Sequence, residues 1–442
     1  MRLYTIYFSL TVAGLLAAPS TTPTPVTFSK QVAPILQKRC QQCHRPGEAA
    51  PMALLTYEQA RPWAKAIKEA VLSKRMPPWF ADPHYGKFKN DRSLGPDEVE
   101  TIKAWVEAGA PEGDRRDLPA PVQWLEGWNI GKPDQSFELP NPYTVPASGT
   151  IEYTYYVIPS GFTEDKWVQM AEVRPGDRSV VHHVIAFIRP PGSKWLADAK
   201  PGEPFVPKRG RRSNNSNNDG GGSEGEGARN ELLVGYAPGL PAAIYEPGQA
   251  KLVKAGSDFV LQMHYTAKGK EATDRTKIGL VFAKEPVRER VVTIPASNSR
   301  FAIPPGADNH EVKSSFTFRE DVRLISLMPH MHLRGKDFEY VFTYPAGEKE
   351  VALKVPRYDF NWQLWYYLDG NKVIPKNTRL DCTAHFDNSA NNKANPDPAV
   401  EVKWGDQSWE EMMIGWFDVA FDAKLQPEQI WRAPRGQAGR SE

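Results

Sequence analysis

Two histidines, His330 and His332, lie one residue apart in the segment Leu327–Phe338, which reads LMPHMHLRGKDF. The apolar run before them, Val322–Met328, is typical of a β-strand. Because residues i and i+2 of a strand point to the same face, both imidazoles can reach one metal ion. Imidazole suits copper, zinc, nickel or iron, so the pair does not choose among these metals. Such a pair is also common as two surface histidines without a ligand.

A second group of histidines lies earlier in the chain. His182 and His183 are adjacent in VVHHVIAF, and His264 follows in LQMHYTAKG, in both cases within a run typical of a strand. Adjacent strand residues normally face opposite sides, so His182 and His183 could share a metal only at a bulge or a strand end. Otherwise one of the two is a core or surface residue. Late in the chain, Met412 in the run EEMM enters another strand-like segment.

The pattern Cys40-Gln-Gln-Cys43-His44 is the attachment motif of c-type haem. In such a motif both thiols bind the haem covalently, and the histidine becomes an axial ligand of the iron. A zinc site and a redox dithiol are the alternatives, but no βαβ pattern surrounds the motif, as a thioredoxin-like redox site would require. The sequence therefore predicts one covalently bound haem c.

A haem used for electron transfer needs a second axial ligand. We expect Met76, which lies in the proline-rich turn RMPPW; Met52 is the alternative, and His84 is a further one that suits a surface position better. This part of the chain resembles small class I c-type cytochromes. Its stretch Ala104–Pro111 looks like the last helix of cytochrome domains fused to bacterial enzymes.

The chain has 442 residues, which suffices for roughly three domains. Apolar residues make up 40% and aromatic residues 11%, which indicates a globular protein with a large core. The formal net charge of +2 argues against a nucleic-acid-binding surface. Cys382 has no disulfide partner if the other two cysteines carry haem, so we expect a buried thiol in a strand. His310 and His385 lie outside any motif, and we expect structural roles for them.

Residues 1–18 read as an export signal, with Arg2 before the mostly apolar run Leu3–Ala18. This run is short for a membrane span. Cleavage near Ala18 is expected, and a retained anchor is the alternative. No other stretch is apolar enough to cross a bilayer, so we predict a periplasmic or secreted protein without a transmembrane segment in its mature form.

Residues 26–114 are predicted to form a small all-α haem domain, and residues 115–128 a proline-containing linker. The predicted helices of the domain are Gln31–Arg39, Tyr57–Ser73 and Gly95–Ala108. From residue 129 onward, short β-branched and aromatic runs recur between turns, which is typical of all-β sandwiches. The predicted strands are Ile151–Val157, Trp167–Val173, Val180–Ile188, Phe259–Tyr265, Lys277–Phe282, Arg290–Ile294, Val322–Met328, Phe338–Tyr344, Arg379–Phe386 and Met412–Val419.

The β region is too long for one small sandwich. A break at 284–290 divides it into two halves of similar size, 129–286 and 287–434. Within the first half, the low-complexity stretch 208–227 predicts an inserted loop that cannot bury a core. The predicted fold class is therefore multidomain, with a small all-α cytochrome c domain followed by two all-β, jelly-roll-like sandwich subdomains.

The order of these motifs is similar to that of the copper type II, ascorbate-dependent monooxygenases, the family of peptidylglycine α-hydroxylating monooxygenase and dopamine β-monooxygenase. The shared order is the HH pair, a YAPG turn at Tyr236–Gly239, a single histidine before Tyr265, the HxH pair and the EEM run. The resemblance covers about 128–419, two thirds of the chain. It implies two nine-stranded, jelly-roll-like subdomains on either side of a solvent cleft.

The resemblance further implies two copper ions bound by different ligand sets. The ligands of the electron-transfer copper would be His182, His183 and His264. The ligands of the copper at which O₂ is activated would be His330, His332 and Met412. A soft thioether in place of a third imidazole favours Cu(I), the oxidation state that must meet O₂.

Three positions depart from the peptide-hydroxylating members of this family. Those members have an arginine two residues before the HxH pair, where this chain has Met328. Their asparagine and tyrosine after the methionine ligand correspond to Ile414 and Trp416. A peptide with a C-terminal glycine is therefore not the expected substrate.

These features predict an exported, haem-fused dicopper monooxygenase that hydroxylates a C–H bond of a small organic substrate with O₂. Electrons would enter through haem c from an ascorbate-like reductant or a redox protein. Two alternatives stay open: a periplasmic electron-transfer cytochrome with a non-catalytic β-sandwich binding module, and a protein that binds or stores copper. The presence of all six expected copper ligands weighs against the first alternative, and oxygen consumption with a reductant separates the enzyme from the second.

Overall fold

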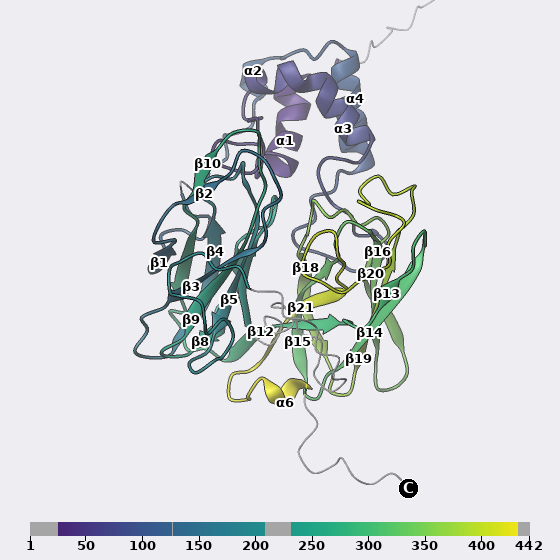
Figure 1. Ribbon diagram of the computed structural model, residues 1–442. Coiled ribbons are helices and arrows are strands. Elements are labelled where there is room, and N and C mark those ends of the chain that lie inside the picture. The colour runs from purple at the N-terminus through teal and green to yellow at the C-terminus, as the bar shows by residue number, and fades with distance from the viewer. Residues whose placement is uncertain (1–24, 126, 208–230, 432–442) are drawn as a thin grey trace, which may run out of the picture.

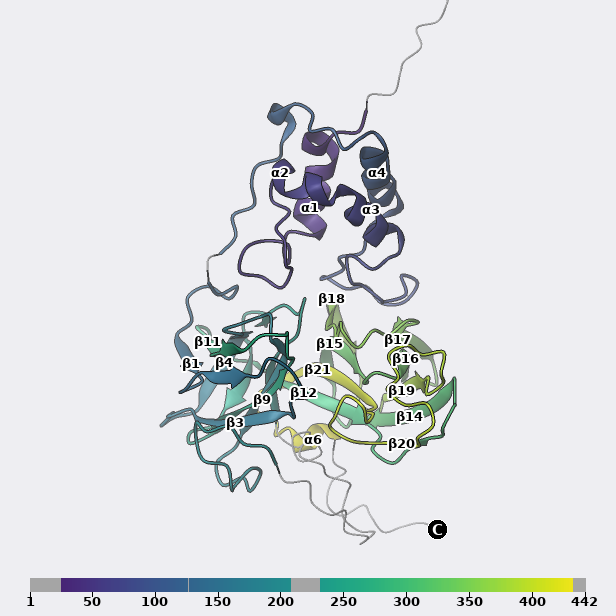
Figure 2. The ribbon, with the colours of Figure 1, turned by 45° about the horizontal axis from the view of Figure 1, so that its top comes forward.

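A computed structural model describes residues 25–125, 127–207 and 231–431. The predicted export signal and the predicted loop 208–227 lie outside the described residues. Figures 1 and 2 show a helical segment at the N-terminal end, placed above two β halves that stand side by side. In the part of the chain that the structure describes, no helix has the length and apolar character needed to span a membrane.

The helical segment confirms the three predicted helical regions. Its elements are η1 (Phe28–Val32), α1 (Ala33–Arg39), α2 (Tyr57–Ala60), η2 (Arg61–Trp63), α3 (Ala64–Leu72), α4 (Pro96–Glu107) and η3 (Arg115–Asp117). Helix α4 begins where expected because Pro96 occupies its first turn and the Glu98 carboxylate accepts a hydrogen bond from the Gly95 N–H at 2.9 Å. The helices pack around Trp105, which is fully buried together with Phe28.

The first β half contains eleven described strands. They are β1 (Gln135–Glu138), β2 (Tyr143–Val145), β3 (Thr154–Pro159), β4 (Lys166–Arg174), β5 (Val181–Arg189), β6 (Glu231–Tyr236), β7 (Ala243–Ile244), β8 (Gln249–Val253), β9 (Asp258–Tyr265), β10 (Ala272–Asp274) and β11 (Lys277–Phe282).

The second half contains ten described strands and a short helix. They are β12 (Glu289–Ser297), β13 (Ala302–Ile303), β14 (His310–Thr317), β15 (Val322–His330), β16 (Gly335–Thr343), β17 (Lys349–Val355), β18 (Tyr366–Ile374), β19 (Arg379–Phe386), β20 (Val402–Lys403), β21 (Ile414–Asp422) and α6 (Glu428–Trp431). All ten strands predicted from the sequence are present, within three residues at either end.

The two halves share one sheet, which the sequence did not indicate. Its strand order is β1-β11-β4-β8-β12-β21-β15-β18, with β7 paired to β4. The join is a short parallel pairing of β8 with β12, where Glu289 lies opposite Gln249. Each half then adds a four-stranded layer, β3-β9-β5-β6 in the first and β14-β19-β16-β17 in the second. Each half is thus a β-sandwich, but the two sandwiches are built on a common layer.

The pleat of β15 and β21 directs alternate side chains to opposite faces of this sheet. Leu327 and Phe417, which are paired, are fully buried in the core of the second half. Their neighbours in the same two strands, Met328 opposite Trp416 and His330 opposite Ile414, face the other way. The opposite face of the sheet, turned toward the first half, therefore carries a histidine amid apolar side chains.

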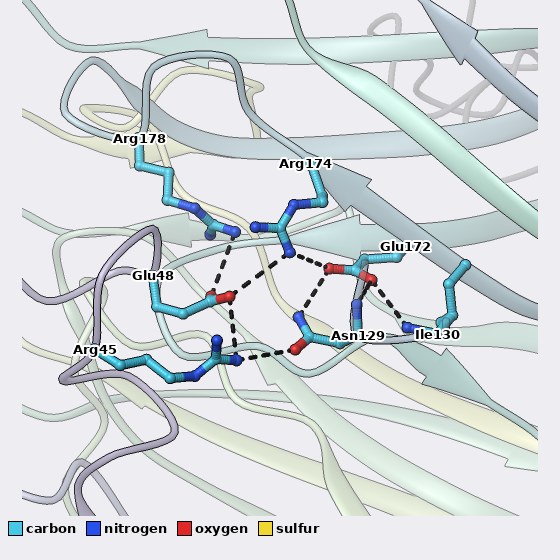
Figure 3. Close-up of polar contacts among 7 residues, drawn as sticks. All are labelled: Arg45, Glu48, Asn129, Ile130, Glu172, Arg174 and Arg178. Atoms are coloured by element: carbon cyan, nitrogen blue, oxygen red, sulfur yellow. Dashed lines mark hydrogen bonds and ion pairs between the residues drawn. The ribbon is translucent and has the colours of Figure 1, made fainter. Parts of the chain in front are cut away.

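The helical segment contacts both halves. Residues 87–89 continue the shared sheet beyond β18, because the Lys89 N–H donates to the Tyr367 carbonyl and the Asp369 N–H donates to the Lys87 carbonyl. On the other side, the loop after the CxxCH motif reaches the first half. Figure 3 shows Glu48 of this loop facing Arg174, Arg178 and its own neighbour Arg45. The Glu48 side chain is about one-eighth exposed, and its carboxylate oxygens lie 3.6, 3.4 and 3.3 Å from the nearest guanidinium nitrogens of these three arginines.

Replacing Glu48 by glutamine is expected to loosen this docking, since the guanidinium groups of Arg45, Arg174 and Arg178 would lose a carboxylate partner in the loop. These contacts are ion pairs between largely buried groups, and we expect a loss of up to about 3–5 kcal/mol, the cost of removing one partner of a buried pair. Hydrogen exchange of the backbone around residues 45–50 measures it. Glu58→Gln is the matched control, because Glu58 pairs with Arg115 in solvent and its loss should leave exchange unchanged. Equal exchange in both variants would contradict a docking role for Glu48.

Candidate metal and haem sites

His182 and His183 converge because β5 has a bulge at His182 in its pairing with β9. Val181 pairs with Tyr265 and His183 pairs with His264, so the register between β5 and β9 shifts by one residue at His182. A bulge places two residues of one strand opposite one residue of the other and turns the extra side chain. The sequence required such a bulge for both imidazoles to reach one point, and the structure contains it.

The three imidazoles of this first site have the spacing of metal ligands. The Nδ1 atom of His183 lies 3.3 Å from that of His182 and 3.4 Å from that of His264. One ligand atom from each ring lies within 4.8 Å of the others. Nitrogens bound to one tetrahedral ion at about 2.0–2.1 Å would be separated by about 3.3 Å. The residues therefore fit a single metal ion held by three nitrogens.

Burial keeps these rings in the neutral form that binds metals. It lowers the pKa of His183 well below its ordinary value, and the neighbouring His264 and His182 lower it further. Burial also lowers the pKa of His264 to about 3, with His182 adding to the shift. A neutral imidazole offers a free lone pair, so the first site is ready to bind a metal at neutral pH.

The second pair, His330 and His332, is oriented by hydrogen bonds to one nitrogen of each ring. His330 Nδ1 lies 2.7 Å from Gln363 Oε1, and His332 Nδ1 lies 3.2 Å from the Glu410 carbonyl oxygen. Because both partners accept, each Nδ1 carries the proton and each Nε2 is left as a ligand atom. Burial lowers the pKa of His330 to about 4 and that of His332 to about 3. The two rings lie 5.3 Å apart between centroids, nearly perpendicular.

The chain just before Met412 contacts this pair. The ladder between β15 and β21 ends at His330 and Ile414, and beyond it the Glu410 carbonyl and the Glu411 carboxylate both contact His332. The predicted strand Met412–Val419 in fact begins at Ile414, so Met412 occupies the approach to β21. Its side chain is fully buried among Trp404, Trp416 and other apolar residues. A thioether, which is soft and uncharged, tolerates this environment.

A buried carboxylate holds the loop that carries His332. The Glu411 oxygens accept hydrogen bonds from the backbone N–H groups of His332 at 2.8 Å and Arg334 at 2.6 Å. Burial raises the pKa of Glu411 to about 8, although the hydrogen bonds from these N–H groups oppose the shift. Arg334 is itself buried and donates to Asn388 Oδ1 and to the Trp409 carbonyl. Asn388 thereby ties the long loop 388–405 to the second site.

Phe360 lies between the two histidine groups. Its ring stacks on His182, with the centroids 5.6 Å apart, and meets His332 edge-on at 5.9 Å. His182 belongs to the first half, whereas Phe360 and His332 belong to the second. The two candidate metal sites therefore face each other across a single aromatic ring.

The CxxCH motif forms one helical turn at the end of α1. The N–H groups of Cys43 and His44 both donate to the Cys40 carbonyl, and the two thiols are not joined as a disulfide. His44 Nδ1 lies 3.2 Å from the Met52 carbonyl oxygen, so this nitrogen carries the proton and Nε2 is free for an iron. The residues fit a haem bound through two thioethers and one imidazole. The Met52 backbone thus contacts the Nδ1 edge of the His44 ring.

The motif lies where the helical segment meets the β halves. Burial raises the pKa of the Cys43 thiol, while the guanidinium groups of Arg92, Arg45 and Arg178 oppose this shift. Arg178 comes from the turn between β4 and β5, just before the first histidine group. Met76 is half-buried after α3, and its N–H donates to the Ala70 carbonyl. Cys43 thus lies near a residue of the first half, and the chain just before Met76 contacts the second half, because Arg357 donates to the Lys74 carbonyl.

The remaining histidines and the third cysteine have structural surroundings. His84 is exposed and bonded to Asp82, and His385 pairs with Asp337 at 2.7 Å. Cys382 is fully buried in β19, as predicted. Sequence reasoning missed the residues that orient or separate the sites, namely Phe360, Gln363 and Glu411. Of these three residues, only Glu411 could have been suspected from the sequence, because it directly precedes the predicted ligand Met412.

No protein-family model matches this chain, and no curated protein matches it. Solved structures give remote similarity only. The infectious bursal disease virus VP2 subviral particle is 12% identical, with 71% of this chain and 76% of that chain covered and a TM-score of 0.19. The Sputnik virophage structure is 10% identical, with 80% and 98% covered and a TM-score of 0.19. At such TM-scores the similarity carries no argument about fold or function.

Proposed function

We propose that this chain is an exported copper monooxygenase that carries its own electron-transfer haem. The helical segment would be a c-type cytochrome domain, and the two β halves would be jelly-roll-like copper domains. In the reaction, a substrate C–H bond, O₂, two electrons and two protons yield a C–OH group and one water. An ascorbate-like reductant or a redox protein would supply the electrons.

The observation that carries the proposal is the pair of facing histidine groups. Three neutral imidazoles converge within metal-ligand spacing in the first half. Two more, each with Nδ1 bonded to an acceptor, face this group across Phe360, and Met412 follows Glu410 and Glu411, which both contact His332. A purely structural role would not require three imidazoles to converge at metal-ligand spacing, because bringing them out of water costs desolvation that a bound metal would offset.

The chain's own residues would bind, orient and isolate the reacting groups. His182, His183 and His264 would hold one copper, and His330, His332 and Met412 the other. Cys40, Cys43 and His44 would hold the haem, with Met76 as the second axial ligand. When bound, the copper beside Met412 would supply O₂ activation, and the other copper and the haem would supply electrons. Gln363 and the Glu410 carbonyl fix the ring orientation of the second pair.

Metal and haem content of the purified, copper-reconstituted protein tests the proposal, followed by oxygen uptake with ascorbate. Two coppers per haem and reductant-dependent uptake are expected. His264→Gln should lose one copper, whereas His385→Gln, which removes a surface histidine paired with Asp337, should lose none. Two coppers without oxygen uptake would indicate copper storage. Haem without copper would indicate an electron carrier joined to a binding module.

Replacing Met76 by alanine is expected to convert the haem from low-spin to high-spin, because the iron would lose its thioether ligand. The absorption spectrum of the oxidised and reduced protein measures the change. Met52→Ala is the matched control and should leave the spectrum as it is, since the Met52 backbone contacts the Nδ1 edge of the His44 ring. An unchanged spectrum in the Met76 variant would show that another residue is the second axial ligand.

A further inference from the structure

A pocket opens between the two β halves, next to both histidine groups. It is bounded by His183 of the first site and by His330 of the second. Its space is about 620 Å³, a value that includes the open mouth and the solvent in it. Because the mouth is part of this volume, the pocket suits a small molecule or the small end of a larger one.

The lining of this pocket is almost entirely apolar. Met328, Ile414 and Trp416 come from the outward face of β15 and β21, and Trp365 comes from the segment before β18. All four are buried. No aspartate, glutamate, lysine or arginine lines the pocket. Since no charged side chain lines the pocket, a charged ligand would lose its hydration without gaining a counter-charge from the lining.

The side-chain amide of Gln363 is a polar group within this lining. Gln363 is 6% exposed and lines the pocket, and its Oε1 is occupied by His330. Its Nε2 is buried and has no hydrogen-bond partner. A buried amide nitrogen without a partner costs free energy, on the order of 1–3 kcal/mol. An acceptor atom on a bound molecule would remove this cost.

We propose that this pocket binds an uncharged, mainly apolar small molecule with one hydrogen-bond acceptor, and that Gln363 Nε2 donates to that acceptor. The proposal names the substrate class of the oxygenase and rests on that function for its role. Gln363 then acts twice, since its oxygen orients His330 and its nitrogen positions the substrate beside the same ring. Trp365 and Trp416 would contact the apolar body.

Three probes of nearly the same shape test the proposal: acetophenone, α-methylstyrene and benzoate. The first is neutral with a carbonyl acceptor, the second lacks the acceptor, and the third carries a negative charge. Their dissociation constants are measured by calorimetry with the copper-free, haem-containing full chain. Acetophenone should bind about 3–10-fold more tightly than α-methylstyrene, as one neutral hydrogen bond predicts, and benzoate should bind more weakly than both.

Variants assign the preference to Gln363. Gln363→Met keeps the side-chain length but removes the donor, so acetophenone should fall to the affinity of α-methylstyrene. Gln363→Glu keeps an oxygen that can accept from His330 but replaces the amide donor by a second oxygen, so it should likewise abolish the preference for acetophenone over α-methylstyrene. Leu240→Trp, at the partly exposed rim, should weaken all the probes together. This third variant keeps the test decisive if the Gln363 variants fold poorly.

The proposal is overturned if benzoate binds as tightly as acetophenone, or if either Gln363 variant retains the preference for the ketone. Binding that Leu240→Trp leaves unchanged would also overturn it, because the probes would then lie elsewhere. Because these titrations use no copper, their outcome is separate from that of the oxygenase proposal. Selective binding without copper uptake would retain the pocket and reject the enzyme, and the converse result would do the reverse.

Discussion

Replacing Met412 by leucine is expected to lower reductant-dependent oxygen uptake by at least about 100-fold, since even partners outside the ligand set change metal sites by 10–100-fold. Leucine preserves apolar volume, so the fully buried site should remain folded at a cost below about 1.5 kcal/mol. The haem spectrum and the copper held by the three-histidine site should be unaffected. The copper–sulfur signal in X-ray absorption of the reduced protein should disappear.

The neighbouring Met413 provides the matched control. It is equally buried, but it lies in the core of the second half with Cys382 and Phe417. Met413→Leu should therefore retain the copper–sulfur signal and the oxygen uptake. Full uptake in the Met412 variant, or equal losses in both variants, would show that the thioether of Met412 is not a ligand.

Replacing Lys251 by methionine is expected to lower the free energy of unfolding by about 3–5 kcal/mol, the usual cost of removing one partner from a buried ionic group. Lys251 on β8 is fully buried, and its ammonium donates to the Leu232 carbonyl and to Thr293 Oγ1. Asp418 on β21 lies 4.0 Å away and also accepts from Ser326. This cluster joins strands of both halves next to the β8–β12 pairing.

Chemical denaturation measures this loss, and two variants control for it. Lys254→Met changes a lysine three residues further along, whose pairing with Asp165 is exposed, and should cost under about 1 kcal/mol. Combining Lys251→Met with Asp418→Asn removes both charges and should restore part of the stability. A Lys251 variant as stable as the Lys254 variant would mean that the cluster does not hold the halves together.

The strands that carry the histidines could be predicted from the sequence because their patterns are local. Apolar and β-branched runs defined β5, β9, β15 and β21 to within three residues. The i, i+2 spacing of His330 and His332 likewise placed both on one face. From the sequence, a bulge at His182 could be named as a condition for a shared metal, but its presence could not be predicted. It depends on how β5 pairs with β9.

Features that arise from pairing between strands of the two halves could not be predicted from the sequence. β8 reads QAKLV and is buried along its whole length, but its central lysine does not indicate a buried strand. The carboxylate near this lysine belongs to Asp418, which lies far along the chain and could not be matched to it from the sequence. β18 contains Asp-Gly-Asn, which indicates a hairpin turn, yet the chain continues through it as a strand. Phe360 and Gln363 lie in the segment before β18, where no periodicity applies.

The pairing of residues 87–89 with β18 has a consequence for the behaviour of the chain in isolation. β18 is the last strand of the nine-stranded sheet, and an uncovered edge offers free N–H and C=O groups to other chains. Phe88, bridged to Leu368, occupies this edge. A chain shortened to its β halves would expose the strand and should self-associate through it. The helical segment thus protects the sheet against aggregation, whatever cofactor it carries.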